Sequence, residues 1–438
     1  MTTKFRILMG ATALCASAGI AAAQDVTLTV ATVNNGDMIR MQGLTSEFEA
    51  ANPGITIEWV VLEENVLREK VTTDIATNGG QYDVMTIGTY EVPIWGSQDW
   101  LKPLEMSAEY DVDDLLPTIR EALSVDGTLY AAPFYGESAM VMYRTDLMEK
   151  AGLEMPDEPT WDFIREAAEK MHDPDNSVYG ICLRGKAGWG ENMALLTSMA
   201  NSFGGKWFDM EWVPQFDQKP WQDAITYYVD IMTNFGPPGV SSNGFNENLA
   251  LFQTGKCGMW YDATVAAGFV TNPNDSTVAD KVGFAQAPTA EGGQKANWLW
   301  AWSLAIPASS ENPEAAQTFI EWATGKGYTE LVAEKEGWIA APPGTRTSLY
   351  ENPEYTKVAP FAEMTLAAIN SANPGSPTVD DVPYVGAQYV AIPEFQGIAT
   401  TVGQLFSAAV SGQSSVEDAL AAAQATATRE MSRAGYPK

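Results

Sequence analysis

Side chains that could carry out acid–base or nucleophilic catalysis are sparse in this chain of 438 residues. Its single histidine, His172, stands before Asp173-Pro174, where a structural or surface role is expected. A Ser-His-Asp hydrolase would have to use that histidine, and no Gly-x-Ser-x-Gly motif accompanies it. Because no His or Cys spacing fits a zinc site, we expect neither a metal nor a cofactor.

Carboxylates are abundant, with 56 Asp and Glu against 25 Lys and Arg. Glu137 and Asp262 follow or end apolar runs and could serve as the acid and base of a glycosidase, but among so many acids some pairs lie close by chance. The chain also holds 14 Trp, 16 Tyr and 16 Phe, several at predicted strand ends beside Asn, Asp or Glu. Carboxylates and amides bond to hydroxyl groups, and aromatic faces pack on C–H groups. The combination favours binding of a polyhydroxylated ligand, although burial in the core explains any single aromatic residue equally well.

Alternating strands and helices must position these residues. Strands are predicted over Val26–Val33, Ile55–Leu62 and Tyr82–Ile87, and apolar residues at helical spacing fill the segments between them. This order predicts a parallel, doubly wound α/β sheet. Binding sites in such sheets lie at the carboxyl ends of the strands, which here are followed by Asn34-Asn35, Glu63-Glu64 and Gly88-Thr89-Tyr90.

The stretch from Thr128 to Gly152 contains two apolar strands separated by Phe134-Tyr135-Gly136-Glu137-Ser138. An ionised glutamate between two buried strands needs partners, because burying a lone carboxylate is costly. A chain that leaves one sheet, crosses a cleft and enters a second sheet explains both the apolar strands and the polar segment. A single long strand with an exposed bend is the alternative.

Composition sets the broad limits. The length favours two domains, and 45% hydrophobic with 18% charged residues is typical of a globular protein. The formal net charge of −31 repels phosphate backbones and anionic lipid headgroups. We therefore expect no nucleic-acid partner and no membrane-surface binding.

The first 23 residues indicate an exported protein. Lys4 and Arg6 precede a weakly apolar run that ends in Ala21-Ala22-Ala23, a pattern typical of a signal peptide cleaved before Gln24. No other stretch is apolar enough to span a bilayer. Outside this segment the chain has two cysteines, Cys182 and Cys257, which could form a disulfide or remain two buried thiols.

Three segments carry a resemblance to a known family: Tyr130–Leu147, Phe252–Asp262 with its Gly-Lys and apolar strand, and Trp302–Ala323. The chain resembles family 1 of the extracellular (periplasmic) solute-binding proteins of ABC transporters, the group of the maltose-binding protein, over essentially its whole mature length. Arg144 departs from the pattern, since Asn or Asp commonly follows the tyrosine there.

The resemblance implies two α/β lobes joined by three crossings, with a ligand cleft between them that closes by hinge motion. Lobe one would comprise residues 24–134 and 288–322, and lobe two residues 135–287 and 323–438, with crossings near 134–137, 285–288 and 321–327. The closed protein would dock on a membrane permease as a monomer. The ligand-binding positions carried over are Asn34, Asn35, Asp37, Tyr90, Glu137, Trp189, Asp262, Trp298, Trp300 and Arg346.

Overall similarity is nearest to the subset that binds hexitols such as sorbitol and mannitol. The resemblance therefore implies a periplasmic protein that captures a polyol or related sugar for an ABC importer. Two other hypotheses remain: a secreted carbohydrate-active enzyme that uses Glu137 and Asp262, and an adhesin or scaffold without a small-molecule ligand. Turnover of a glycoside would identify the enzyme, and absence of stabilisation by any sugar would identify the scaffold.

Overall fold

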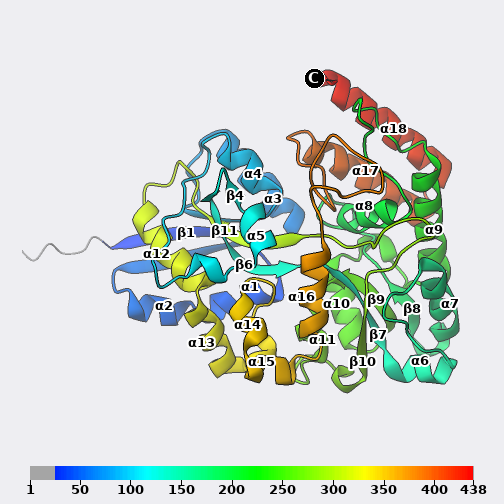
Figure 1. Ribbon diagram of the computed structural model, residues 1–438, viewed down its shortest axis with the longest axis horizontal. Coiled ribbons are helices and arrows are strands. Elements are labelled where there is room, and N and C mark those ends of the chain that lie inside the picture. The colour runs from blue at the N-terminus through cyan, green and yellow to red at the C-terminus, as the bar shows by residue number, and fades with distance from the viewer. Residues whose placement is uncertain (1–24, 438) are drawn as a thin grey trace, which may run out of the picture.

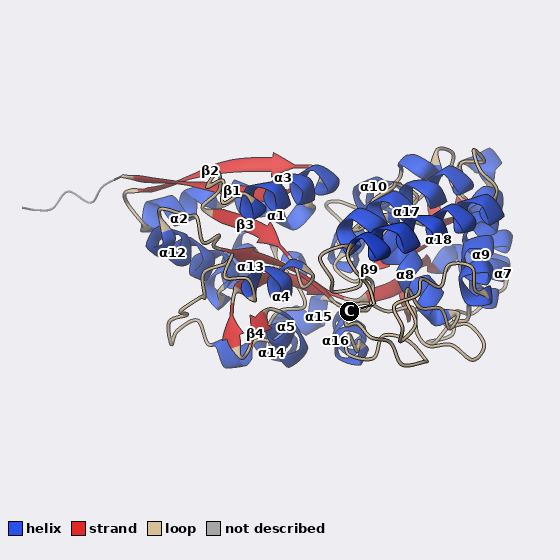
Figure 2. Ribbon diagram, turned by 90° about the horizontal axis from the view of Figure 1, so that it is seen from above, coloured by secondary structure: helices blue, strands red, loops and turns tan. Residues whose placement is uncertain are grey.

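The computed structural model describes residues 25–437, and Figure 1 shows two α/β lobes side by side. The predicted signal peptide, residues 1–23, lies outside the described residues. Each lobe is built around one sheet with helices packed against it (Figure 2). The mixed α/β, two-lobed architecture predicted from the sequence is confirmed.

Lobe one contains a five-stranded sheet in the order β2-β1-β3-β11-β6. Strand β1 pairs in parallel with β2 and β3, as the alternation of strands and helices predicts, while β11 runs antiparallel to β3 and β6. The strands are β1 (Val26–Val33), β2 (Ile55–Leu62), β3 (Val84–Ile87), β6 (Ala131–Glu137) and β11 (Trp300–Ala305). The main helices of this lobe are α1 (Gly36–Gly43), α2 (Thr45–Ala51), α3 (Glu64–Ala76), α4 (Glu91–Gly96), α5 (Pro117–Ala122) and α12 (Pro313–Thr324).

Lobe two contains a four-stranded sheet in the order β10-β7-β9-β8. Its strands are β7 (Ala139–Arg144), β8 (Tyr179–Cys182), β9 (Cys257–Ala263) and β10 (Val282–Gln286). Its helices are α6 (Thr145–Ala151), α7 (Trp161–Met171), α8 (Asn192–Ser202), α9 (Lys219–Phe235), α10 (Phe245–Gln253), α11 (Ala266–Thr271), α17 (Phe395–Val410) and α18 (Val416–Arg433). Cys182 and Cys257 form a disulfide with a Cα–Cα distance of 5.8 Å, which decides between the two alternatives left by the sequence.

The predicted crossover strand is present. Glu137, the last residue of β6, pairs with Trp300 in the sheet of lobe one. Only Ser138 separates it from Ala139, which pairs with Ala263 in the sheet of lobe two. Glu137 therefore stands at the point where the chain passes between the lobes, one residue before the second sheet begins.

The other two connections differ from the predicted boundaries. Residues 288–296, which we assigned to lobe one, lie against lobe two, because Trp161 donates a backbone hydrogen bond to Thr289 O (3.0 Å) and the Tyr261 hydroxyl bonds to Ala296 O. The return to lobe one is completed only at β11.

Helices α13 (Lys326–Glu336), α14 (Thr347–Glu351) and α15 (Pro353–Val358) follow α12 and lie with lobe one in Figure 1, although we assigned them to lobe two. Leu116 donates a backbone hydrogen bond to Thr345 O (2.9 Å), and Gly136 donates one to Pro343 O (2.9 Å). Helix α16 (Ala362–Ser371) contacts β6, β7 and β10, so the third connection runs through α16 rather than through residues 321–327.

Candidate ligand-binding site

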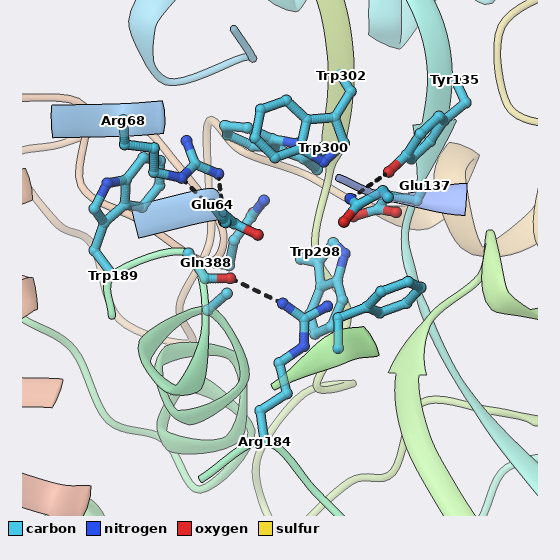
Figure 3. A pocket seen from close by; sticks show the side chains of 14 residues that line it. Glu64, Arg68, Tyr135, Glu137, Arg184, Trp189, Trp298, Trp300, Trp302 and Gln388 are labelled. Atoms are coloured by element: carbon cyan, nitrogen blue, oxygen red, sulfur yellow. Dashed lines mark hydrogen bonds and ion pairs between the residues drawn. The ribbon is translucent and has the colours of Figure 1, made fainter. Parts of the chain in front are cut away.

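A pocket lies between the two lobes where the crossover strand passes, and both lobes supply its walls (Figure 3). The cavity left between its side chains is small, about 30 Å³, so the lobes enclose little free space in this arrangement. Its lining combines aromatic rings with carboxylates, guanidinium groups and amides. These residues are Asn35, Glu64, Arg68, Tyr135, Glu137, Arg184, Trp189, Gly190, Ala194, Phe245, Trp298, Trp300, Trp302 and Gln388.

Three tryptophans form the aromatic wall of the pocket. Trp300 and Trp302 are two residues apart on β11, so the strand's period of two places both on the same face. Their ring centroids are 5.4 Å apart at an interplanar angle of 83°, and Trp298 lines the pocket just before the strand begins. Flat indole faces suit the C–H groups of a carbohydrate chain, whereas its hydroxyl groups need polar partners.

Arg68, on α3, organises the polar side of this wall. Its guanidinium group donates to Glu64 Oε1 through Nε (2.9 Å) and Nη2 (2.8 Å), and to Glu91 Oε1 through Nη1 (2.9 Å). The same group lies 4.7 Å from the Trp302 ring and 3.9 Å from the Trp189 ring. This buried cation neutralises two buried carboxylates and holds an aromatic side chain from each lobe.

Arg184 is the buried cation on the lobe-two side of the pocket, as Arg68 is on the lobe-one side. Its Nε donates to Asp262 Oδ2 (2.9 Å), and its Nη1 donates to Gly190 O (2.8 Å). Asp262 is fully buried and also accepts from Trp260 Nε1 (3.0 Å). Burial lowers the pKa of the Arg184 guanidinium but the charge of Asp262 raises it further, so the group stays cationic. Arg184 faces the pocket, and Asp262 holds it from behind.

Glu137 is the acid left without a partner. Its side chain is buried, with 6% exposure of the residue, and no hydrogen bond to it is found among residues 25–437. Burial raises the pKa of the Glu137 carboxyl to about 8, although Arg184 lowers it, and the charge of Asp262 raises it. A carboxyl group that faces a pocket without a protein partner is well placed to bond to hydroxyl groups of a ligand.

The two lobes are in direct contact beside the pocket. Lys186 Nζ lies 2.6 Å from Glu63 Oε1, and Asn65 Nδ2 donates to Ala187 O (3.1 Å). Gly190 packs so closely on α3 that a Cβ atom on it would lie 2.0 Å from Glu64 Oε1. These contacts join the loop before α8 to the N-terminus of α3, so the structure has the closed arrangement of the lobes.

Half of the predicted site residues line this pocket, and their roles in binding remain predictions. They are Asn35, Glu137, Trp189, Trp298 and Trp300. Asn35 Nδ2 donates to the Tyr135 hydroxyl (3.0 Å), which orients a second polar group of the lining. The Trp189 Nε1 atom is buried and has no hydrogen-bond partner among the residues that the structure describes.

The other five predicted residues do not line the pocket. Asn34 is exposed, and Asp37 pairs with Arg40 beside a second, smaller cavity. Tyr90 lies behind Trp189, with ring centroids 4.9 Å apart, and its hydroxyl donates to the Ile392 carbonyl (2.9 Å).

Asp262 and Arg346 are the remaining two. Asp262 reaches the pocket only through Arg184. Arg346 lies 3.4 Å from Asp114 and donates to Thr324 O (3.3 Å) within lobe one. Both are held by charged partners from distant parts of the sequence, which the resemblance of their own segments does not reveal.

Nine residues of the lining were not predicted. For some of them a signal was present: Glu64 follows a strand end, Tyr135 belongs to the crossover segment, Arg184 and Gly190 bound the glycine-rich loop, and Trp302 continues the tryptophan alternation. For the others the sequence gives no local signal, because they reach the pocket from helices and a distant loop. These are Arg68, Ala194, Phe245 and Gln388.

Among residues 25–437, no group of three or more His, Cys, Asp or Glu side chains is arranged to hold a metal ion. Within the same range, no helix has the length and apolar character needed to cross a membrane.

Comparison with known proteins gives a consistent result. Residues 35–330 match the family of bacterial extracellular solute-binding proteins. A mannitol-binding protein of Pseudomonas aeruginosa is 55% identical over 97% of this chain and 98% of its own length. A solute-binding protein of Agrobacterium vitis, solved with bound D-mannitol, is 67% identical with a TM-score of 0.93 over 94% of this chain and all of that one. A protein of Agrobacterium radiobacter solved with ribitol is 25% identical with a TM-score of 0.82 over 93% of this chain and 99% of that one. The chain belongs to the bacterial extracellular solute-binding proteins.

Proposed function

We propose that this protein is the periplasmic substrate-binding component of an ABC importer and that its ligand is a hexitol, D-mannitol in the first place. The observation that carries the proposal is the interlobe pocket, in which tryptophan faces alternate with polar groups that hydroxyls can reach. The relatives that bind mannitol support the choice, since they match nearly the whole chain and not the fold alone.

The polar lining of the pocket agrees with a small polyol. A hexitol has few non-hydrogen atoms, so its affinity depends on many polar contacts within an enclosed site. Glu137, Arg184 and Asn35 supply acceptors and donors, and Trp300 and Trp302 supply flat apolar faces. Ligand bound to both lobes stabilises the closed arrangement, which the monomeric protein then presents to its permease.

The carbohydrate-active enzyme is less well supported. It required Glu137 and Asp262 to act together as acid and base. Asp262 has no exposed surface, and its oxygens accept from Arg184, Trp260 and its neighbour's backbone amide. A base in that position cannot reach a water molecule beside a ligand, so we infer binding without turnover.

Calorimetry on the purified protein tests the proposal directly. We expect D-mannitol to bind with one site per chain, sorbitol and arabitol to bind more weakly or equally, and maltose and trehalose not to bind. Recovery of unchanged mannitol after incubation separates a binding protein from an enzyme. Binding of maltose but not of any hexitol would contradict the proposed ligand, and binding of neither class would contradict the carbohydrate function.

A further inference from the structure

The connection between α16 and α17 is long and contains no helix or strand from residue 372 to residue 394. Connections of this length without regular structure are uncommon in compact proteins and are usually functional. Residues 384–392, which we call the strap, are mostly buried although they belong to this loop. A buried loop needs partners for its polar groups, and those partners show what the strap does.

On the side of lobe one, the strap bonds to the carboxyl end of β3. The Tyr389 hydroxyl donates to Thr89 O (3.1 Å), and the Tyr90 hydroxyl donates to Ile392 O (2.9 Å). The Tyr389 ring also packs against Trp300, with centroids 6.2 Å apart. Thus the strap covers the strand end where ligands of such sheets bind, and it stands directly behind the aromatic wall.

On the side of lobe two, α8 and the segment after it hold the strap. Asn201 Nδ2 donates to Ala387 O (2.7 Å), and Trp207 N donates to the Tyr384 hydroxyl (3.0 Å). The turn between these contacts requires Gly386, whose φ is +120° and whose Cβ position would lie 2.3 Å from Tyr389 O. The strap is therefore a fixed part of the closed protein that is bonded to both lobes.

Gln388 is the strap residue that lines the pocket. Its Nε2 donates to Leu299 O (2.9 Å), and its Oε1 accepts from Leu299 N (3.3 Å). Leu299 stands between Trp298 and Trp300, so the amide of Gln388 is locked to the backbone of the aromatic wall. With 2% exposure, Gln388 forms a rigid wall of the pocket and not a side chain free to swing away.

We propose that the strap limits the length of the ligand, and that Gln388 is the specificity-determining residue that closes the pocket to anything longer than one polyol chain. The inference rests on the polyol-binding function proposed above. The fold itself does not impose this limit, since a Thermotoga maritima protein with a TM-score of 0.77 to this one was solved with maltose. The wall must therefore come from features of this chain.

The test compares D-mannitol with maltitol, a hexitol that carries one glucose unit. We expect the wild-type protein to bind mannitol and to show no calorimetric binding of maltitol. In Gln388→Ala the wall is removed, and we expect maltitol binding to become measurable, with a ratio of the maltitol Kd to the mannitol Kd at least tenfold below the lower limit set by the wild-type protein. Gln388→Asn, shorter by one methylene, should lower the same ratio if the alanine variant does not fold.

Val385→Ala is the matched control, because Val385 belongs to the strap but is 53% exposed and does not line the pocket. It should leave both affinities unchanged. An unchanged ratio in both Gln388 variants would overturn the inference, even if their stability falls, because a purely structural role predicts no change in selectivity. Wild-type protein that binds both ligands equally would also overturn it, while wild-type protein that binds neither would instead refute the polyol function.

Discussion

Replacing Glu137 with glutamine should stabilise the protein and weaken ligand binding, both in a pH-dependent way. The pKa of this carboxyl is raised from 4.5 to about 8 by burial. Its folded-state pKa thus exceeds its unfolded-state value, so the unfolded chain releases the proton first as pH rises. The free energy of unfolding therefore falls as the pH rises from about 4.5 to about 8, and it does not fall further above pH 8.

The size of the effect follows from the shift. Each pKa unit corresponds to about 1.4 kcal/mol. Compared with a neutral group of the same shape, Glu137 therefore lowers the free energy of unfolding by roughly 3 kcal/mol at pH 7 and by roughly 5 kcal/mol above pH 8. Glutamine removes this dependence. Urea unfolding of both proteins without ligand should therefore give a difference in free energy that is small at pH 5 and grows to several kcal/mol at pH 8.5.

Binding should change in the opposite direction. A hydrogen bond to an ionised group contributes roughly 1–2 kcal/mol more than a neutral one, so we expect Glu137→Gln to bind mannitol about 5- to 30-fold more weakly at pH 8.5. At pH 5 the wild-type carboxyl is protonated, and the two affinities should converge. A stability difference that does not grow with pH would refute the assignment of a raised pKa. An affinity that is the same for both proteins at pH 8.5 would refute the contact with ligand.

Three other changes test separate parts of the structure. Arg68→Met leaves Glu64 and Glu91 buried without their cation, so urea titration should show a free energy of unfolding lower by about 3–5 kcal/mol. An unchanged urea midpoint would show that Arg68 does not neutralise these two carboxylates. Gly190→Ala places a methyl group against Glu64. It should abolish the rise in melting temperature on adding mannitol, while the melting temperature without ligand stays within a few degrees of that of the wild-type protein. A retained rise would show that closure does not need this contact. Replacing both Cys182 and Cys257 with serine should lower the free energy of unfolding by about 2–4 kcal/mol, and treating the wild-type protein with a reductant should lower it by the same amount. A melting curve that does not change with reductant would contradict the disulfide.

Much of the fold could be predicted because it depends on local patterns. The parallel strands of lobe one follow from the alternation of apolar strands and amphipathic helices, and the crossover follows from a glutamate between two apolar strands. The lobe boundaries seen in the structure differ from the predicted ones because they depend on contacts between residues far apart in the sequence. Helices α13 to α15 return to lobe one through bonds such as those of Thr345 and Pro343, which no local pattern in residues 323–358 indicates.

The binding site divides in the same way, into residues whose place follows from local patterns and residues whose place depends on distant partners. Trp298, Trp300 and Glu137, three positions implied by the family resemblance, line the pocket, and the crossover segment of the sequence already indicated a cleft at Glu137. Asp262 and Arg346 do not line the pocket, because each is paired with a charged residue from another element, Arg184 and Asp114 respectively. Whether a charged residue faces a ligand or another side chain is decided by what packs opposite it, and the sequence alone does not give that pairing.

The strand order of lobe one has a consequence for how the protein is made. Strand β11 lies between β3 and β6, yet it is synthesised only after all four strands of the other sheet. The N-terminal lobe cannot complete its core while the ribosome is still translating the second lobe, and neither lobe corresponds to one uninterrupted stretch of the gene. The same strand order also means that the two lobes must mature together, as a pair, after the last strand has emerged.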